Sequence, residues 1–170
     1  MKARLVFQAL SRKNIGCDDL IGEAEKIQWR RWLDDLPKLQ EVQVDRCFRP
    51  REFGEQLHLF SEASRQGYAS VAYLRVKDEY SRIHCAFVMG KARLAPVREI
   101  SVPRLELTAA VISVKLFRII REELDMNFQK VFYRTDSMSA LKCINNESKK
   151  FHTFESSRLT VIHTGSSHLD

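Results

Sequence analysis

Apolar and polar positions repeat with two different periods along the chain, and the change of period divides it into predicted elements. Between Pro103 and Leu124 apolar residues recur every three or four positions, which predicts a helix about 30 Å long. Its apolar stripe consists of Leu107, Val111, Val114, Phe117, Ile120 and Leu124. Pro103 suits the first helical position, because its fixed φ is helical and its missing N–H needs no partner there. The stripe predicts packing against a sheet.

Three strands are predicted before this helix and one after it. β-branched and aromatic residues fill 57–60, 68–76 and 83–89, and turn residues separate these stretches. The stretch 83–89 is almost continuously apolar, which predicts a strand covered on both faces. Residues 130–134 predict the fourth strand. Because a strand that returns after a helix normally makes a right-handed parallel crossover, we expect the fourth strand beside the first.

A helix is also predicted before the sheet. Its apolar stripe consists of Trp29, Trp32, Leu33 and Leu36. Asp18 or Asp19 is a candidate cap of this helix, and Pro37 is a candidate stop. Stripes of this kind pack against other elements more often than they bind ligands, so we expect a packing face.

The composition changes between this helix and the sheet. Residues 40–55 mix charge, proline and glycine with few apolar anchors, so we predict a boundary near residue 50. It divides a helical connection segment at 1–50 from an α/β domain at 51–170 with the order β-β-β-α-β-α. Residues 137–145 predict a short helix after the fourth strand. Phe151, Phe154 and Ile162 indicate a further helix.

The composition restricts the class of protein. With 170 residues and 44% hydrophobic content, the chain can form one domain with a true core. The net charge of +6 favours a polyanionic partner, although it also fits an ordinary basic protein. The four cysteines lack the spacing of a zinc site or a disulfide framework. No apolar stretch approaches the roughly 18 residues of a membrane span and no signal peptide is evident, so we expect an unsecreted, soluble intracellular protein.

Three acidic residues are predicted to converge. Glu62 follows the first strand, Glu106 lies at the start of the long helix, and Asp136 ends the fourth strand. Open sheets place ligands at such strand ends. Because neighbouring carboxylates repel one another, a cation would bind there, and oxygen ligands suit Mg²⁺ or Mn²⁺. Two such ions about 3.5–4 Å apart can promote phosphodiester hydrolysis. The competing interpretation of Glu106 is a solvated acid near a helix N-terminus.

Several stretches resemble the ribonuclease H region of Bel/Pao-type LTR retrotransposon polyproteins. They are Leu59-Phe60-Ser61-Glu62-Ala63-Ser64, Lys91-Ala92-Arg93-Leu94-Ala95-Pro96, Val102-Pro103-Arg104-Leu105-Glu106-Leu107 with Ala109-Ala110, and Thr135-Asp136-Ser137. Gly16–Leu20, the paired tryptophans and Asp45–Phe48 are similar to the connection that follows the reverse transcriptase in those polyproteins. The resemblance implies an RNase H-like fold that cuts the RNA strand of an RNA–DNA hybrid, with Mg²⁺ as cofactor. It also implies the reverse transcriptase domain of the same polyprotein as partner, in the cytoplasm or a retroelement particle.

Transferred by this resemblance, the catalytic and metal-binding residues are Glu62, Glu106 and Asp136. The family pattern has Asp where this chain has Glu62, and the extra methylene moves the carboxylate by about 1.5 Å. Shifts of about 1 Å can cost on the order of a hundredfold in rate, so we expect impaired catalysis. The chain reaches Asp170 without a pattern for a fifth strand, beyond which the family has its fourth carboxylate. We therefore expect a sheet truncated before strand five.

Four further residues are candidate nucleic-acid contacts: Ser64, Arg93, Arg104 and Ser137. Each has an alternative interpretation, because basic residues also form solvated surfaces and serines also form turns and helix caps. Two alternative functions stay open at this point. The domain could be a catalytically inert module that binds nucleic acid or packs against a reverse transcriptase, or the chain could be a decayed polyprotein fragment.

Overall fold

The structure is a computed structural model that describes residues 2–43, 55–124, 128–146 and 150–166. The chain forms two compact units, the first comprising residues 1–44 and 96–99 and the second the remainder. The predicted boundary near residue 50 and the motif Asp45–Phe48 lie outside the described residues. No helix in the described part of the chain is both long enough and apolar enough to cross a membrane.

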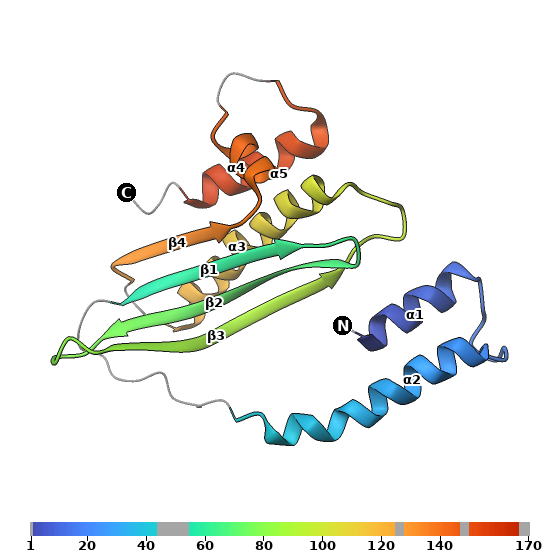
Figure 1. Ribbon diagram of the computed structural model, residues 1–170. Coiled ribbons are helices and arrows are strands. Elements are labelled where there is room, and N and C mark those ends of the chain that lie inside the picture. Colours follow the sequence, from blue (N-terminus) through green and yellow to red (C-terminus); the bar gives the residue numbers. More distant parts are fainter. Residues whose placement is uncertain (1, 44–54, 125–127, 147–149, 167–170) are drawn as a thin grey trace. The chain divides into compact units, whose positions relative to one another are not determined.

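The second unit is built on a four-stranded mixed sheet (Figure 1). Its strands are β1 (Gln56–Ala63), β2 (Gly67–Lys77), β3 (Ile83–Leu94) and β4 (Lys130–Thr135), in the spatial order β3-β2-β1-β4. β1 pairs antiparallel with β2 and parallel with β4. The predicted crossover that places the fourth strand beside the first is therefore confirmed, and β4 is an edge of the described sheet.

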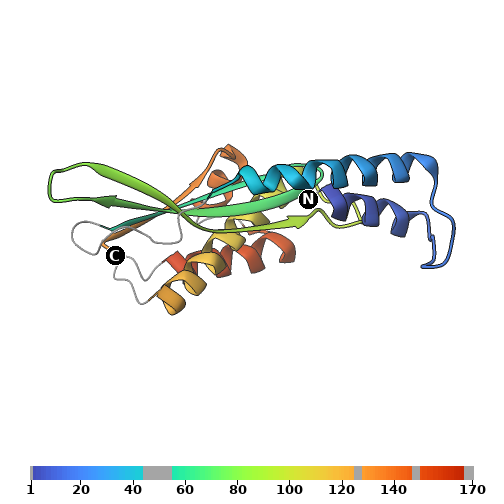
Figure 2. The ribbon, with the colours of Figure 1, turned by 90° about the horizontal axis from the view of Figure 1, so that it is seen from below.

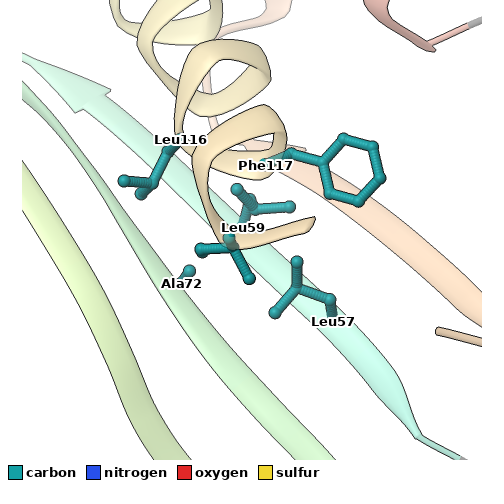
Figure 3. Close-up of a cluster of buried hydrophobic side chains, with 6 residues drawn as sticks. Leu57, Leu59, Ala72, Leu116 and Phe117 are labelled. Atoms are coloured by element: carbon teal, nitrogen blue, oxygen red, sulfur yellow. The ribbon is translucent and has the colours of Figure 1, made fainter. Parts of the chain in front are cut away.

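One long helix, α3 (Val102–Leu124), packs against β1 and β2. The predicted stripe is confirmed, since Leu107, Val114 and Ile120 are at most 2% exposed. Figure 3 shows Leu116 and Phe117 of α3 over Leu57, Leu59 and Ala72 of the sheet, which together with Ile120 form a buried cluster. α3 starts one residue earlier than predicted, because the carbonyl of Ser101 accepts hydrogen bonds from the N–H groups of Arg104 and Leu105. Pro103 is thus the second helical residue.

Two further helices follow β4. They are α4 (Met138–Ile144) and α5 (Thr153–Ser166), as the sequence predicts. α5 packs against α3, where Leu159 and Ile162 join Leu107, Val111 and Val114 in a second buried cluster. Figure 2 shows α3 (yellow) and α5 (red) on the same side of the sheet. This arrangement places α5 against the first turns of α3.

The prediction that residues 83–89 are covered on both faces is wrong. β3 is an edge strand, and Ile83, Phe87 and Met89 remain 56%, 41% and 36% exposed. Among these apolar residues, Phe87 extends a row of aromatic rings on the sheet face that points away from α3. In that row the ring centroids of Phe87 and Tyr73 lie 5.8 Å apart, and those of Tyr73 and Phe60 lie 6.2 Å apart.

The first unit contains α1 (Lys2–Arg12), α2 (Glu23–Asp35) and the 3-10 helix η1 (Leu36–Glu41). α1 was not predicted from the sequence, and it packs against α2 through an edge-to-face contact between Phe7 and Trp29. This contact confirms the predicted packing role for Trp29. The predicted aspartate cap is wrong, because α2 starts after Gly22. The carboxylate of Asp19 instead accepts a hydrogen bond from the N–H of Gly16 at 2.7 Å.

Candidate active site

A cleft of about 460 Å³ opens at the carboxyl ends of β1 and β4. Its lining includes Phe60, Ser61 and Glu62 from β1 and Arg134, Thr135 and Asp136 from the end of β4. Ser61 is the parallel partner of Thr135, so Glu62 and Asp136 are the next residues along two adjacent strands. Both acids are exposed to solvent. The structure thus places two of the three predicted acids at one cleft.

The third predicted acid, Glu106, lies in the second turn of α3 and is only 7% exposed. The backbone N–H of Ala63, the last residue of β1, faces its carboxylate and stabilises the charged form. The carboxylate oxygen Oε2 is buried and has no hydrogen-bond partner among the described residues. A solvated helix-terminal acid would be exposed, so that competing interpretation of Glu106 is wrong. The sheet end holds this side chain out of solvent.

The electrostatic environment couples the three acids. Burial raises the pKa of Glu106, and repulsion from Asp136 and, to a smaller extent, from Glu62 raises it further. The N–H of Ala63 opposes these effects by stabilising the charged form. Because the carboxylates repel one another across a partly buried site, a bound cation would favour their charged forms.

The donor set suits a hard divalent cation. All three side chains offer carboxylate oxygens, and the unpartnered Oε2 of Glu106 is the kind of atom that a cation would satisfy. The described residues nevertheless contain no group of three acidic, histidine or cysteine side chains gathered closely enough to hold an ion. The carboxylates therefore fit Mg²⁺ or Mn²⁺ in chemistry and charge, whereas their described positions do not form a closed ligand cluster.

Two of the predicted nucleic-acid contacts have structural roles. The N–H of Ser64 donates to the carbonyl of Gly67 at 2.8 Å in the turn between β1 and β2. The hydroxyl of Ser137 caps α4, accepting a hydrogen bond from the N–H of Ala140 at 3.2 Å. Either residue can still face a ligand, so their assignment as nucleic-acid contacts stays a prediction.

The two predicted arginines differ in their surroundings. Arg93 is exposed on β3, opposite Tyr68 of β2. Arg104 forms an ion pair with Glu155 of α5 at 2.7 Å, and its guanidinium lies over the ring of Phe154. An arginine held by a carboxylate presents less charge to phosphates, so Arg93 is the stronger candidate for contact with nucleic acid.

Arg134 also lines the cleft and was not predicted as a site residue from the sequence. Its guanidinium lies over the rings of Phe60 and Phe132, and its Nε donates to Nδ1 of His58 at 3.3 Å. Strand alternation was the available signal, because residues 134 and 136 occupy the same side of a strand that ends in a candidate ligand. Arg134 gives the cleft a positive group beside its two exposed acids.

Comparison with known proteins supplies the family. The sequence model described as "Pao retrotransposon-like RNaseH-like domain" matches residues 1–137. No curated protein matches the chain. Solved structures that resemble it include RNase H1 from the halophilic archaeon Halobacterium salinarum, at 12% identity and a TM-score of 0.43, covering 68% of this chain and 80% of that one.

Two more solved structures resemble the chain. The N-terminal RNase H domain of a Mycobacterium tuberculosis protein is 7% identical with a TM-score of 0.45, covering 68% of this chain and 77% of that one. LC11-RNase H1, in complex with an RNA/DNA hybrid, is 10% identical with a TM-score of 0.42, covering 68% and 78%. The family assignment rests on the match over residues 1–137 rather than on these structures.

Proposed function

Since the chain belongs to the Pao retrotransposon-like RNaseH-like domain family, we propose that it hydrolyses the RNA strand of RNA–DNA hybrids. The observation that carries this proposal is the environment of Glu106. It is a buried carboxylate with one unpartnered oxygen, and its pKa is raised by burial and by repulsion from Asp136 and Glu62. Perturbed acids of this kind concentrate at catalytic sites.

RNase H-like folds generally use divalent metal ions, and we assign Mg²⁺ or Mn²⁺ to Glu62, Glu106 and Asp136. Bound ions would activate a water molecule for attack on the phosphodiester and stabilise the leaving oxygen. Glu106 would contribute its unpartnered Oε2, and the nearby N–H of Ala63 would stabilise the charged carboxylate. Asp136 and Glu62 would contribute from the ends of β4 and β1, where the open cleft admits a nucleic-acid backbone.

Glu62 sets the expected rate. Its side chain is one methylene longer than the aspartate of the family pattern, which displaces the carboxylate by about 1.5 Å. We therefore expect slow turnover, and Glu62→Asp should accelerate cleavage by up to roughly a hundredfold. The expected partners are the hybrid itself and the reverse transcriptase domain of the same polyprotein, in the cytoplasm or a retroelement particle.

The test is cleavage of a hybrid with labelled RNA in Mg²⁺ and in Mn²⁺. We expect Glu106→Gln and Asp136→Asn to lose at least a hundredfold in rate, because each change removes a charged ligand. Glu123→Gln is the matched control, since Glu123 is exposed in the last turn of the same helix. Equal rates for Glu106→Gln and Glu123→Gln would refute the proposed site.

A second candidate function is an inert module that binds nucleic acid. The absence of a closed three-ligand group among the described residues, together with Glu62 in place of aspartate, favours it. Such a module would bind hybrid with an affinity that falls steeply with salt, because phosphate contacts release counterions. Cleavage by the natural chain that is lost in Asp136→Asn excludes it, whereas cleavage by Glu62→Asp alone would indicate a decayed nuclease.

A further inference from the structure

α5 contacts the first turns of α3 through two polar links on either side of Glu106 in the sequence. Nε of Arg104 donates to Oε1 of Glu155 at 2.7 Å. Four residues later along α3, Oγ1 of Thr108 accepts a hydrogen bond from Nε of Arg158 at 3.0 Å. Both links connect residues about fifty positions apart, so they join two helices and stabilise neither one alone.

The two links share one aromatic ring. The guanidinium groups of Arg104 and Arg158 lie over Phe154 of α5, with Cζ 5.1 Å and 3.4 Å from the ring centroid. Arg158 also donates to the carbonyl oxygen of Phe154 at 2.9 Å. The cation–π contacts and hydrogen bonds hold both guanidinium groups in one orientation. A solvated arginine would keep its rotamer freedom, so these two side chains have a structural role. We call Arg104, Thr108, Phe154, Glu155 and Arg158 the helix clamp.

Helix geometry places the helix clamp opposite Glu106. Residues 104 and 108 are one turn apart and share a face of α3, whereas residue 106 lies about 200° around the axis from residue 104. Glu106 therefore faces the end of β1, where the N–H of Ala63 stabilises its carboxylate, while α5 holds the other side of the same turns. A helix end held from one side presents the opposite side at a fixed distance from the sheet.

An apolar contact reinforces this arrangement at the other end of α5. A Cβ added at Gly165 would lie 2.1 Å from Cγ1 of Val114, so the two helices approach more closely there than any side chain on α5 would allow. α5 is thus anchored along its length against α3, by packing near its C-terminus and by the helix clamp near its N-terminus. Residues 138–170, which include α5, lie beyond the stretch that matches the family.

We propose that Arg158 and Glu155 are positioning residues, which hold the first turns of α3 so that the Glu106 carboxylate stays against the N–H of Ala63. Neither residue touches the candidate reacting groups. The catalytic consequence rests on the proposed function, whereas the position of Glu106 can be measured without any activity.

The experiment measures amide hydrogen exchange by NMR in the full chain. Arg158→Leu removes both hydrogen bonds and keeps an apolar stem. Thr108→Val removes the acceptor with little change of shape, and Thr108→Ser retains it. We expect the Ala63 amide to exchange roughly fivefold faster or more in Arg158→Leu and Thr108→Val, because its contact with the Glu106 carboxylate is weakened. Thr108→Ser should stay close to the natural chain.

The test includes a control variant and a second amide that reports global unfolding. Lys115→Gln removes an exposed positive charge from α3 away from the helix clamp and should leave the Ala63 amide unchanged. Leu74, in the buried centre of the sheet, reports global opening. Unchanged exchange at Ala63 in Arg158→Leu and Thr108→Val overturns the proposal. Equal acceleration at Ala63 and Leu74 also overturns it, since the helix clamp would then contribute only to overall stability.

Cleavage kinetics separate this proposal from the proposed function. With hybrid as substrate, Thr108→Val should lower kcat several-fold and leave KM within about twofold, because the residues that contact nucleic acid are unchanged. If exchange at Ala63 responds as expected and the natural chain and Glu62→Asp both fail to cleave, the positioning role stands and the proposed function fails. A rise in KM alone in Thr108→Val would overturn the positioning role and indicate a substrate contact.

Discussion

Replacement of Gly165 by alanine is the sharpest test of how closely α5 packs on α3. Because the new Cβ would lie 2.1 Å from Cγ1 of Val114, where carbon atoms normally stay about 3.5–4.0 Å apart, the Val114 side chain or one of the two helices must shift by more than about 1 Å. Overpacking of this size costs roughly 3 kcal/mol, the upper end of the usual range. Alanine returns about 1 kcal/mol, because it favours helix more than glycine does.

The expected net loss for Gly165→Ala is therefore about 2 kcal/mol in the free energy of unfolding, or roughly 4–8 °C in Tm for a chain of this length. Thermal unfolding followed by circular dichroism measures it. Ser156→Ala, at an exposed position of the same helix, is the control and should stay within about 0.5 kcal/mol of the natural chain. A Gly165→Ala protein that unfolds at or above the natural Tm would refute the close approach of α3 and α5.

Three further predictions concern stability. Leu116→Ala should cost about 2–5 kcal/mol in urea unfolding, because Leu116 is fully buried, whereas Leu39→Ala, at a site 64% exposed, should cost under about 0.5 kcal/mol. Ser70→Ala should cost about 1–3 kcal/mol in the free energy of unfolding, because it leaves the buried hydroxyl of Ser113, 2.8 Å away, without its hydrogen-bond partner. The double variant Ser70→Ala with Ser113→Ala should recover part of that loss. Burial raises the pKa of Asp78, but hydrogen bonds from His84 and Arg82 outweigh burial and lower this pKa to about 2. The charged Asp78 therefore stabilises the fold above its unfolded pKa near 4, and this stabilisation is lost as the pH falls to about 2. A comparison of Tm against pH with Asp78→Asn checks this, and parallel curves would contradict it.

The central elements of the fold could be predicted because their signals are local. The stripe of α3 repeats over six turns, and the strand–helix–strand order limits β4 to a place beside β1. The exposure of β3 could not be predicted from its apolar residues, because position within a sheet depends on which strands pair. α1 has a clearly amphipathic pattern over its 11 residues, so it could have been predicted from the sequence but was missed.

Some residues of the candidate site could likewise be predicted from local patterns, and others could not. Glu62 and Asp136 could be predicted, because each follows a predicted strand and strand ends are where ligands bind. Whether Glu106 was a solvated acid or a buried one depended on how α3 packs against the end of β1, which no local pattern contains. The pairing of Arg104 with Glu155 likewise joins two helices, so no local pattern could predict it, and the contact of Arg104 with nucleic acid stays a prediction.

Binding of Mn²⁺ is the most direct test of a cation site at Glu62, Glu106 and Asp136, because binding does not depend on the slow turnover expected from Glu62. In an NMR titration, the paramagnetic ion broadens amide signals close to its site. We expect early, selective broadening of the Ala63 and Ser137 amide signals, which is abolished in Glu106→Gln and retained in Glu123→Gln. Broadening that is uniform over the acidic surface, or unchanged in Glu106→Gln, would contradict a cation site formed by Glu62, Glu106 and Asp136.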